Sequence, residues 1–123
     1  MLTAQFNEDA LLVHLSGAIT SADVTTLERT ANEYLASHPN IPGVMVETRT
    51  FPGFASAGAF GGYVRFVLSH RTRVRRVALV TDSMLAPVAK FIANRVMGIE
   101  MRHYPFARRA AALDWLRVGS VAA

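Results

Sequence analysis

The residues that could act as nucleophile, acid or base are few, and their spacing matches no catalytic motif. Ser56 lies one residue away from the G-x-S-x-G nucleophile elbow and follows a loop rather than a strand. A triad would have to join Ser56 to Asp82 and His103, but any sequence with four histidines permits such a combination. We therefore predict no catalytic residues and expect that the protein is not an enzyme.

Metal and nucleotide sites are not indicated either. The four histidines, at positions 14, 38, 70 and 103, lack the i, i+4 or H-x-E-H spacing of metal ligands. The chain has no cysteine, which excludes disulfides and thiolate ligands. Gly58, Gly61 and Gly62 form neither a G-x-G-x-x-G motif nor a P-loop. The sequence therefore predicts no metal and no cofactor.

The most unusual segment is FPGFASAGAFGGYVRF, residues 51–66. It contains five aromatic residues, in a chain with seven Phe, three Tyr and one Trp, and four of the eight glycines. No charged residue lies between Arg49 and Arg65. Apolar surface of this extent covers a core, closes over an apolar ligand, or meets a membrane or a partner protein.

Basic residues are concentrated around this segment, in a chain of net charge +4. No acidic residue occurs between Glu47 and Asp82, an interval that contains Arg49, Arg65, Arg71, Arg73, Arg75 and Arg76. A solvated surface is the common explanation of such a cluster. Attraction to anionic lipid headgroups is the alternative, with Arg65, Arg71 and Arg73 as the predicted contacts. Nucleic acid is disfavoured, because no helix-turn-helix, RNA-recognition or KH pattern accompanies the arginines.

The length and composition indicate one globular domain over residues 1–123. A chain of 123 residues supports a single core, and 51% apolar with 18% charged residues is typical of a folded protein. No apolar run approaches the roughly 20 residues that span a bilayer, and the first residues lack a secretory signal pattern. We expect a cytoplasmic protein, with peripheral membrane association as an option.

The order of elements predicts an α/β fold. Apolar patterns indicate strands at residues 2–6, 11–17, 44–48, 74–81 and 100–104. Helices are expected after Thr20, over 57–69, from Asp82 or Ser83, and over 107–118. The resulting order, ββαβαβαβα, predicts a mostly parallel five-stranded sheet with helical cover. The first strand could also pair edge to edge with a second copy, which would give a homodimer.

Three local features refine these helices. Thr20 and Asp23 resemble a capping box at the start of the first helix, which Pro39 and Pro42-Gly43 are expected to end. Asp82 or Ser83 is expected to cap the third helix. The core stripe of that helix is predicted to be Leu85, Val88, Ala89, Ile92 and Val96, which leaves Phe91 outside the stripe.

The end of the chain carries the most specific family pattern. Tyr104 closes the last strand, and Ala112-Leu113-Asp114-Trp115-Leu116 matches an Ala-x-x-Trp-Leu ending. With the segments RRVALVTD and ITSADV, the chain resembles the SpoIIAA-like family from about Phe6 to Leu116. That family has the STAS fold and is related to CRAL-TRIO lipid-exchange domains.

The resemblance implies a small non-enzymatic binding module. Members of the SpoIIAA-like branch are thought to bind apolar ligands and associate with membranes. Other STAS proteins act as anti-sigma-factor antagonists or as regulatory domains of anion transporters. The phosphorylatable Asp-Ser-Ser/Thr-Gly motif of the partner-switching members is replaced here by ETRTF, residues 47–51. The sequence therefore disfavours a serine phosphoswitch at this place. Thr48, Thr50 or Ser56 are the alternative sites of phosphorylation.

The candidate site follows from the expected sheet. Ligands of open α/β sheets bind at the carboxyl ends of the strands, where residues 51–66 and 82–85 leave the third and fourth strands. We predict an apolar site lined by Phe51, Phe54, Phe60, Tyr63, Phe66, Met84, Leu85 and Phe91. Gly58, Gly61 and Gly62 would allow a lid to move. Alternatively the rings complete the core, and the orientations of Phe54 and Phe60 distinguish the two cases.

The expected function is thus a non-enzymatic module that captures an apolar or amphipathic, lipid-like ligand, with a membrane surface as a potential location. The alternative is a regulatory protein–protein interaction module of the anti-sigma-factor-antagonist type, without the usual phosphoserine motif, that uses the same surface. Burial of apolar area would drive ligand binding, and the charges would add orientation.

Overall fold

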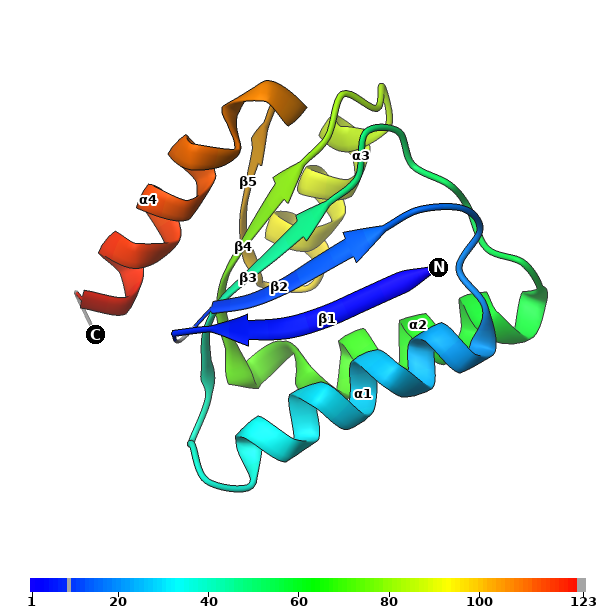
Figure 1. Ribbon diagram of the computed structural model, residues 1–123, viewed down its shortest axis with the longest axis horizontal. Helices are drawn as coiled ribbons and strands as arrows, with labels where there is room; N and C mark the ends of the chain where they lie inside the picture. Colours follow the sequence, from blue (N-terminus) through cyan, green and yellow to red (C-terminus); the bar gives the residue numbers. More distant parts are fainter. Residues whose placement is uncertain (9, 122–123) are drawn as a thin grey trace.

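The computed structural model describes residues 1–8 and 10–121. The chain forms five strands and four α-helices in the predicted order (Figure 1). They are β1 Leu2–Asn7, β2 Ala10–Leu15, α1 Ser21–Leu35, β3 Ile41–Glu47, α2 Ala57–His70, β4 Val74–Val80, α3 Ala86–Phe91, β5 Glu100–Tyr104 and α4 Arg109–Val121. The predicted α/β class and element order are confirmed.

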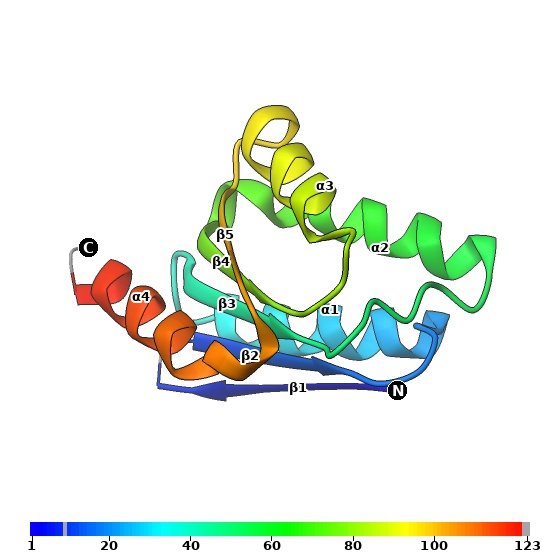
Figure 2. The same ribbon diagram turned by 90° about the horizontal axis from the view of Figure 1, so that it is seen from above.

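The five strands form one sheet in the order β1-β2-β3-β4-β5. β1 and β2 are antiparallel, whereas the other three neighbouring pairs are parallel. Successive side chains of a strand point to opposite faces, so Val44 and Val46 join the core beneath α1 and α3, while Met45 packs with α4. Helices α1, α2 and α3 thus lie on one face, and α4 covers the other (Figure 2).

The predicted capping box at the start of α1 is confirmed. The Asp23 N–H donates to Thr20 Oγ1 at 3.1 Å, and the Thr20 N–H donates to Asp23 Oδ2 at 3.0 Å. The second carboxylate oxygen of Asp23 accepts a hydrogen bond from the Leu2 N–H at 3.2 Å, which ties the helix to β1. The bond from the Thr20 backbone lowers the pKa of Asp23, because it stabilises the ionised carboxylate.

The third strand begins earlier than the sequence predicts. It starts at Ile41, so Pro42 and Gly43 lie inside β3 and do not end the preceding segment. Pairing with β2 begins only at Gly43, whereas pairing with β4 begins at Ile41. Because Pro42 precedes the part of the strand that is paired on both sides, its missing N–H removes no bond to β2.

The start of α3 also differs from the prediction. The helix begins at Ala86, after Leu85, and has no side-chain cap. Asp82 Oδ1 accepts a hydrogen bond from the Phe106 N–H at 2.9 Å, and Ser83 Oγ accepts one from the Leu85 N–H at 3.2 Å. The Asp82 carboxylate therefore fixes the segment that leads into α4, which is why it does not cap α3.

The predicted core stripe of α3 is wrong. Ala86 and Ala93 face the sheet and are 2% and 5% exposed, whereas Leu85, Val88 and Val96 are 57%, 56% and 65% exposed. The helix continues into a π-helical turn, Ile92–Val96, in which Met97 N–H donates to Ile92 O. Small side chains let the helix lie close to the sheet, and the wider turn shifts the helical phase.

Helix α4 closes the opposite face through the residues of the family pattern. Ala112, Trp115 and Leu116 pack against Met45, Ala78 and Val80 in one buried cluster. A Cβ atom at Gly43 would lie only 3.1 Å from Leu116 Cδ2, so the glycine permits the close approach of α4 to β3.

Candidate ligand-binding surface

Four of the predicted aromatic residues meet where the loop that follows β3 enters the first turns of α2. Phe54 is the centre of the cluster, with ring centroids 5.9 Å from Phe51, 5.2 Å from Phe60 and 5.4 Å from Tyr63. These separations and the edge-on or tilted angles are typical of stabilising aromatic pairs. Phe66 does not take part in these contacts, and its ring lies 4.4 Å from that of His70 instead.

The loop that carries this cluster is attached to the start of α1. The Ile19 N–H donates to Gly53 O at 2.9 Å, and the Ala55 N–H donates to Ile19 O at 2.8 Å. Gly53 has a φ of 79°, a backbone conformation that favours glycine. Ser56 then caps α2, because its Oγ accepts a hydrogen bond from the Ala59 N–H at 3.1 Å. The half of the segment that leads into α2 is thus held by hydrogen bonds at Gly53, Ala55 and Ser56.

The rings divide between the core and the surface. Phe54, Tyr63 and Phe66 are half-buried against the core cluster beneath α1, whereas Phe51 and Phe60 are exposed, Phe60 by 53%. Burial raises the pKa of the Tyr63 phenol, so it stays protonated at neutral pH. The two alternatives therefore apply to different rings. Phe54 points inward and completes the core, whereas Phe60 points outward.

The predicted hinge glycines lie within α2 and not in a loop. Gly58 is in its first turn, and Gly61 and Gly62 are in its middle. A Cβ atom at Gly62 would contact Val24 Cγ1 at 3.5 Å, whereas a Cβ atom at Gly61 would have no neighbour within 4 Å. Because a side chain at position 61 would meet no neighbour, a substitution there changes helix propensity without changing packing.

We expect Gly61→Ala to raise the free energy of unfolding by about 0.5 to 1 kcal/mol, because alanine has the higher helix propensity and meets no steric obstacle. Urea denaturation followed by circular dichroism measures this change. Gly53→Ala is the matched control and is expected to destabilise, since its φ is positive. Destabilisation by Gly61→Ala would show that this position needs the conformational freedom of glycine.

The other predicted wall of the site lies on α3 and the turn before it. Met84 is 94% exposed and Phe91 is 61% exposed. Figure 2 shows α2 and α3 on the same side of the sheet. Between them, Val67 of α2 packs against the cluster that contains Ala93, in the π-helical turn that continues α3. The two halves of the predicted site therefore occupy neighbouring helices, with their outward side chains open to solvent.

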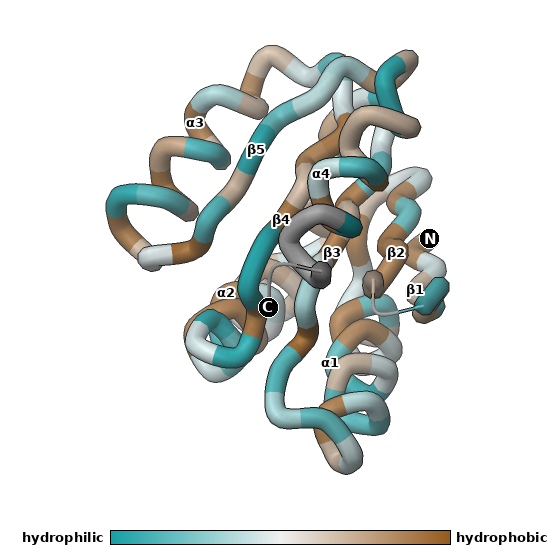
Figure 3. Tube along the Cα trace, turned by 90° about the vertical axis from the view of Figure 1, so that its left-hand side faces the viewer, coloured by the Kyte–Doolittle hydropathy of each residue, from teal (hydrophilic) through white to brown (hydrophobic). Residues whose placement is uncertain are grey.

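Among residues 1–8 and 10–117, whose side chains the structure describes, large exposed apolar side chains are confined to this part of the chain. Apart from Met1, all of them fall between residues 51 and 96. We call them the α2–α3 surface: Phe51, Phe60, Leu68, Met84, Leu85, Val88, Phe91, Ile92 and Val96. The outward side of α2 adds a shallow apolar depression lined by Gly61, Val64, Arg65 and Leu68. Hydrophobic segments along α2 and α3 are visible in Figure 3.

The structure separates the arginines that the sequence groups together. Arg65 lies beside the apolar depression on α2. Arg71 and Arg73 follow the other end of this 14-residue helix, about 20 Å from its start at the aromatic cluster. Arg73 also donates hydrogen bonds to the carbonyls of Leu35, His38 and Pro39. Arg71 and Arg73 therefore do not adjoin the exposed rings as the linear sequence implies.

Two further cations, which sequence reasoning overlooked, lie on α3 and its π-helical extension. Lys90 and Arg95 are both exposed and alternate with the exposed apolar side chains. The sequence could have indicated them, because both lie between the apolar residues that we assigned to the core stripe of α3. Between Glu47 and Glu100 the sequence has a single acidic residue, Asp82, whose carboxylate accepts a hydrogen bond from the Phe106 N–H. The α2–α3 surface is accordingly apolar and cationic.

The polar residues considered for catalysis have separate structural roles. Ser56 caps α2, Asp82 bonds Phe106, and His103 Nε2 is 2.7 Å from Thr81 O. Thr48, a candidate for phosphorylation, is 3% exposed and donates to Thr50 O at 2.8 Å. Within the part of the chain that the structure describes, no group of three or more His, Cys, Asp or Glu residues is arranged to hold a metal ion.

One cluster of charges joins β2, β3 and α4 on the opposite face. Glu47 is 16% exposed and accepts from Arg109 Nε through Oε2, while His14 Nδ1 lies 3.3 Å from Oε1. The three residues attach the start of α4 to the carboxyl end of β3. They lie on the face away from the α2–α3 surface.

Comparison with known proteins decides the family. The SpoIIAA-like family model matches residues 10–117. The chain belongs to the SpoIIAA-like family. A solved structure of an uncharacterised protein from the DUF3478 family, with a SpoIIAA-like fold, from Shewanella loihica PV-4 is similar over 94% of this chain and 92% of that chain. The TM-score is 0.77 at 22% sequence identity, which supports the fold. No curated protein matches the sequence.

Membership of the SpoIIAA-like family confirms the resemblance and supports a binding or regulatory module. Proteins of this family are generally non-enzymatic. None of the described helices combines the length and apolarity needed to span a bilayer.

Proposed function

We propose that this SpoIIAA-like protein captures an apolar or amphipathic, lipid-like ligand at the surface of an anionic membrane. The α2–α3 surface is the part of the molecule that would contact the bilayer. The observation that carries the proposal is the orientation of α3, which places alanines against the sheet and large apolar side chains in solvent.

The exposure of α3 is energetically unfavourable unless another apolar phase covers it. Met84, Leu85, Val88, Phe91 and Val96 are each more than half exposed. Burial of apolar area contributes about 25 cal/mol per Å², so transfer of several such side chains into an acyl layer would contribute several kcal/mol. Helices with this distribution lie in the membrane interface.

The charges select an anionic surface. Arg65, Lys90 and Arg95 lie among the exposed apolar residues, and the one intervening acid, Asp82, bonds Phe106 on the segment that leads to α4. Basic residues near an anionic bilayer contribute about 1 kcal/mol each. A second copy docked through the same surface would bring like charges together, which favours the membrane over self-association here.

The aromatic cluster is the proposed ligand contact. Phe54 is fixed against the core, whereas Phe51 and Phe60 present their rings outward beside the depression on α2. An acyl chain lying between α2 and α3 would cover these rings and the apolar side chains of α3. Apolar burial would dominate its affinity, and Arg65 would favour a negatively charged head group.

Vesicle flotation with charge variants tests this proposal. We expect the wild-type protein to float with phosphatidylglycerol-containing vesicles but not with pure phosphatidylcholine vesicles, and added salt to weaken the binding. Lys90→Gln/Arg95→Gln should lower the affinity by about tenfold or more, since two interfacial charges are lost. Arg29→Gln/Arg108→Gln is the control, because it removes two exposed charges from other elements.

Equal losses in the two double variants would show that net charge, and not the α2–α3 surface, governs binding. Absence of flotation with either vesicle, together with stable capture of one protein on immobilised wild-type chain, would favour the protein-interaction alternative. Native mass spectrometry of the purified protein would then test ligand capture separately from membrane contact.

A further inference from the structure

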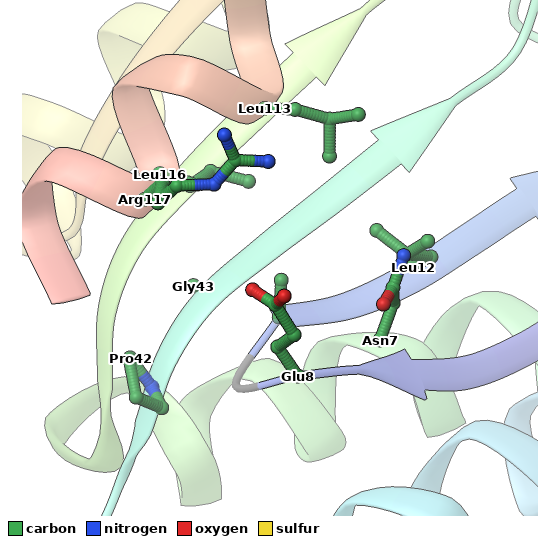
Figure 4. Close-up of a pocket in the computed structure, with 9 residues that line it drawn as sticks. Asn7, Glu8, Leu12, Pro42, Gly43, Leu113, Leu116 and Arg117 are labelled. Atoms are coloured by element: carbon green, nitrogen blue, oxygen red, sulfur yellow. The ribbon is translucent and has the colours of Figure 1, made fainter.

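The opposite face of the sheet has a separate hollow of about 100 Å³, between α4 and the β1–β2 hairpin (Figure 4). Leu12, Leu113 and Leu116 form an apolar floor, and Pro42 and Gly43 of β3 form one wall. Because the α2–α3 surface is on the other side of the sheet, this hollow takes no part in the function proposed above.

Two opposite charges border the hollow. Glu8 comes from the hairpin and Arg117 from α4, and Figure 4 shows their side chains pointing toward the space from two sides. Arg117 Nη1 lies 3.6 Å from Asp114 Oδ1, in a pair that is largely exposed. A small molecule seated on the leucine floor would therefore meet a carboxylate at one end and a guanidinium at the other.

The conformation of Glu8 points to a use for its side chain. Its φ is 59°, and it is the one non-glycine residue with positive φ in the described chain. Asn7 pairs with Ala10, so Glu8 is the first residue after the paired part of β1, and tight hairpin turns require positive φ at their first position. Gly, Asn and Asp are favoured there, whereas Glu is not. The turn explains why the backbone has a positive φ at this position, but it does not explain why the residue there is glutamate.

From the hollow, its opposed charges and the unfavoured glutamate, we infer that this site binds a small zwitterion with an aliphatic body. Its cationic end pairs with Glu8 and its anionic end with Arg117, while its methylene groups lie on Leu12, Leu113 and Leu116. An uncharged apolar molecule would form an ion pair with neither Glu8 nor Arg117. The site is thus distinct in chemistry as well as in position from the membrane-facing surface.

Titration of the isotope-labelled protein with 5-aminopentanoate, up to tens of millimolar, tests the inference by NMR. We expect shifts at the amides of Leu12, Gly43 and Leu116 and none at the aromatic cluster. Pentanoate and pentylamine each lack one charge and should bind about fivefold more weakly, the factor that corresponds to 1 kcal/mol for an exposed ion pair. Equal affinity for all three compounds, or no shift with any of them, would overturn the inference.

Variants of Glu8 separate its role in binding from its role in the turn. Glu8→Gly should raise the melting temperature, since glycine suits the positive φ, and should weaken 5-aminopentanoate binding about fivefold. Glu8→Gln and Arg117→Gln should weaken binding equally, whereas Asp114→Asn should not, because Asp114 does not line the hollow. Unchanged affinity of Glu8→Gly for 5-aminopentanoate would contradict the proposed site, and this result would leave the proposed membrane function unaffected.

Discussion

Replacement of Trp115 by alanine is expected to lower the free energy of unfolding by about 3 to 5 kcal/mol. Trp115 is 8% exposed at the centre of the cluster that joins α4 to β3 and β4. The guanidinium carbons of Arg76 and Arg102 lie 4.8 and 5.0 Å from the centre of its ring. The substitution removes both the packing and the cation–π contacts, and leaves a cavity beneath α4.

Urea denaturation monitored by far-ultraviolet circular dichroism measures this loss, since Trp115 is the sole tryptophan and its fluorescence disappears in the variant. Trp115→Phe is the matched control: it keeps an aromatic ring in the cluster and should cost less than half as much. A loss below about 1 kcal/mol for Trp115→Ala would show that α4 contributes little to the stability of the fold.

The second large effect is expected from Val88→Ser/Phe91→Ser on α3. Both side chains are more than half exposed, so the free energy of unfolding should change by no more than about 0.5 kcal/mol. Binding to anionic vesicles should nevertheless fall by at least about tenfold, because the variant removes the apolar area that enters the interface.

Flotation and calorimetric unfolding of the same samples separate these two effects. Thr3→Ser/Gln5→Ser is the control, since both residues are exposed on β1 and point away from the core beneath α1. It should leave vesicle binding unchanged. Strong destabilisation of the α3 variant would mean that Val88 and Phe91 are buried in solution, which would contradict their exposure in the structure.

Local patterns in the sequence predicted those parts of the fold that depend on neighbouring residues. Thr20 and Asp23 form their capping box because each bond spans only three residues. The run before Thr81 is a buried central strand because apolar side chains occupy both of its faces. The start of β3 was missed because the rule against proline in strands depends on pairing partners, which a linear sequence does not display.

The candidate site was predictable in composition but not in orientation. Helical periodicity in α3 permits two stripes, one of large apolar residues and one of alanines, and only contact with the sheet decides which is buried. In the same way, Phe54 and Phe60 are equivalent in sequence, but the bridge between Ile19 and Phe54 turns one inward and leaves the other exposed. For Arg71 and Arg73 the sequence suggested a closeness that the structure does not have, because the length of α2 separates them from the rings that precede them in the chain.

The most direct test of the membrane-facing α3 is the polarity around its exposed side. Because the chain has no cysteine, Phe91→Cys would carry a single environment-sensitive nitrobenzoxadiazole label. The structure predicts a blue shift and an increase in emission when anionic vesicles are added, and no change for the same label at Thr3→Cys on β1. Equal responses at the two positions, or no response at position 91 while the protein floats with the vesicles, would contradict insertion of α3.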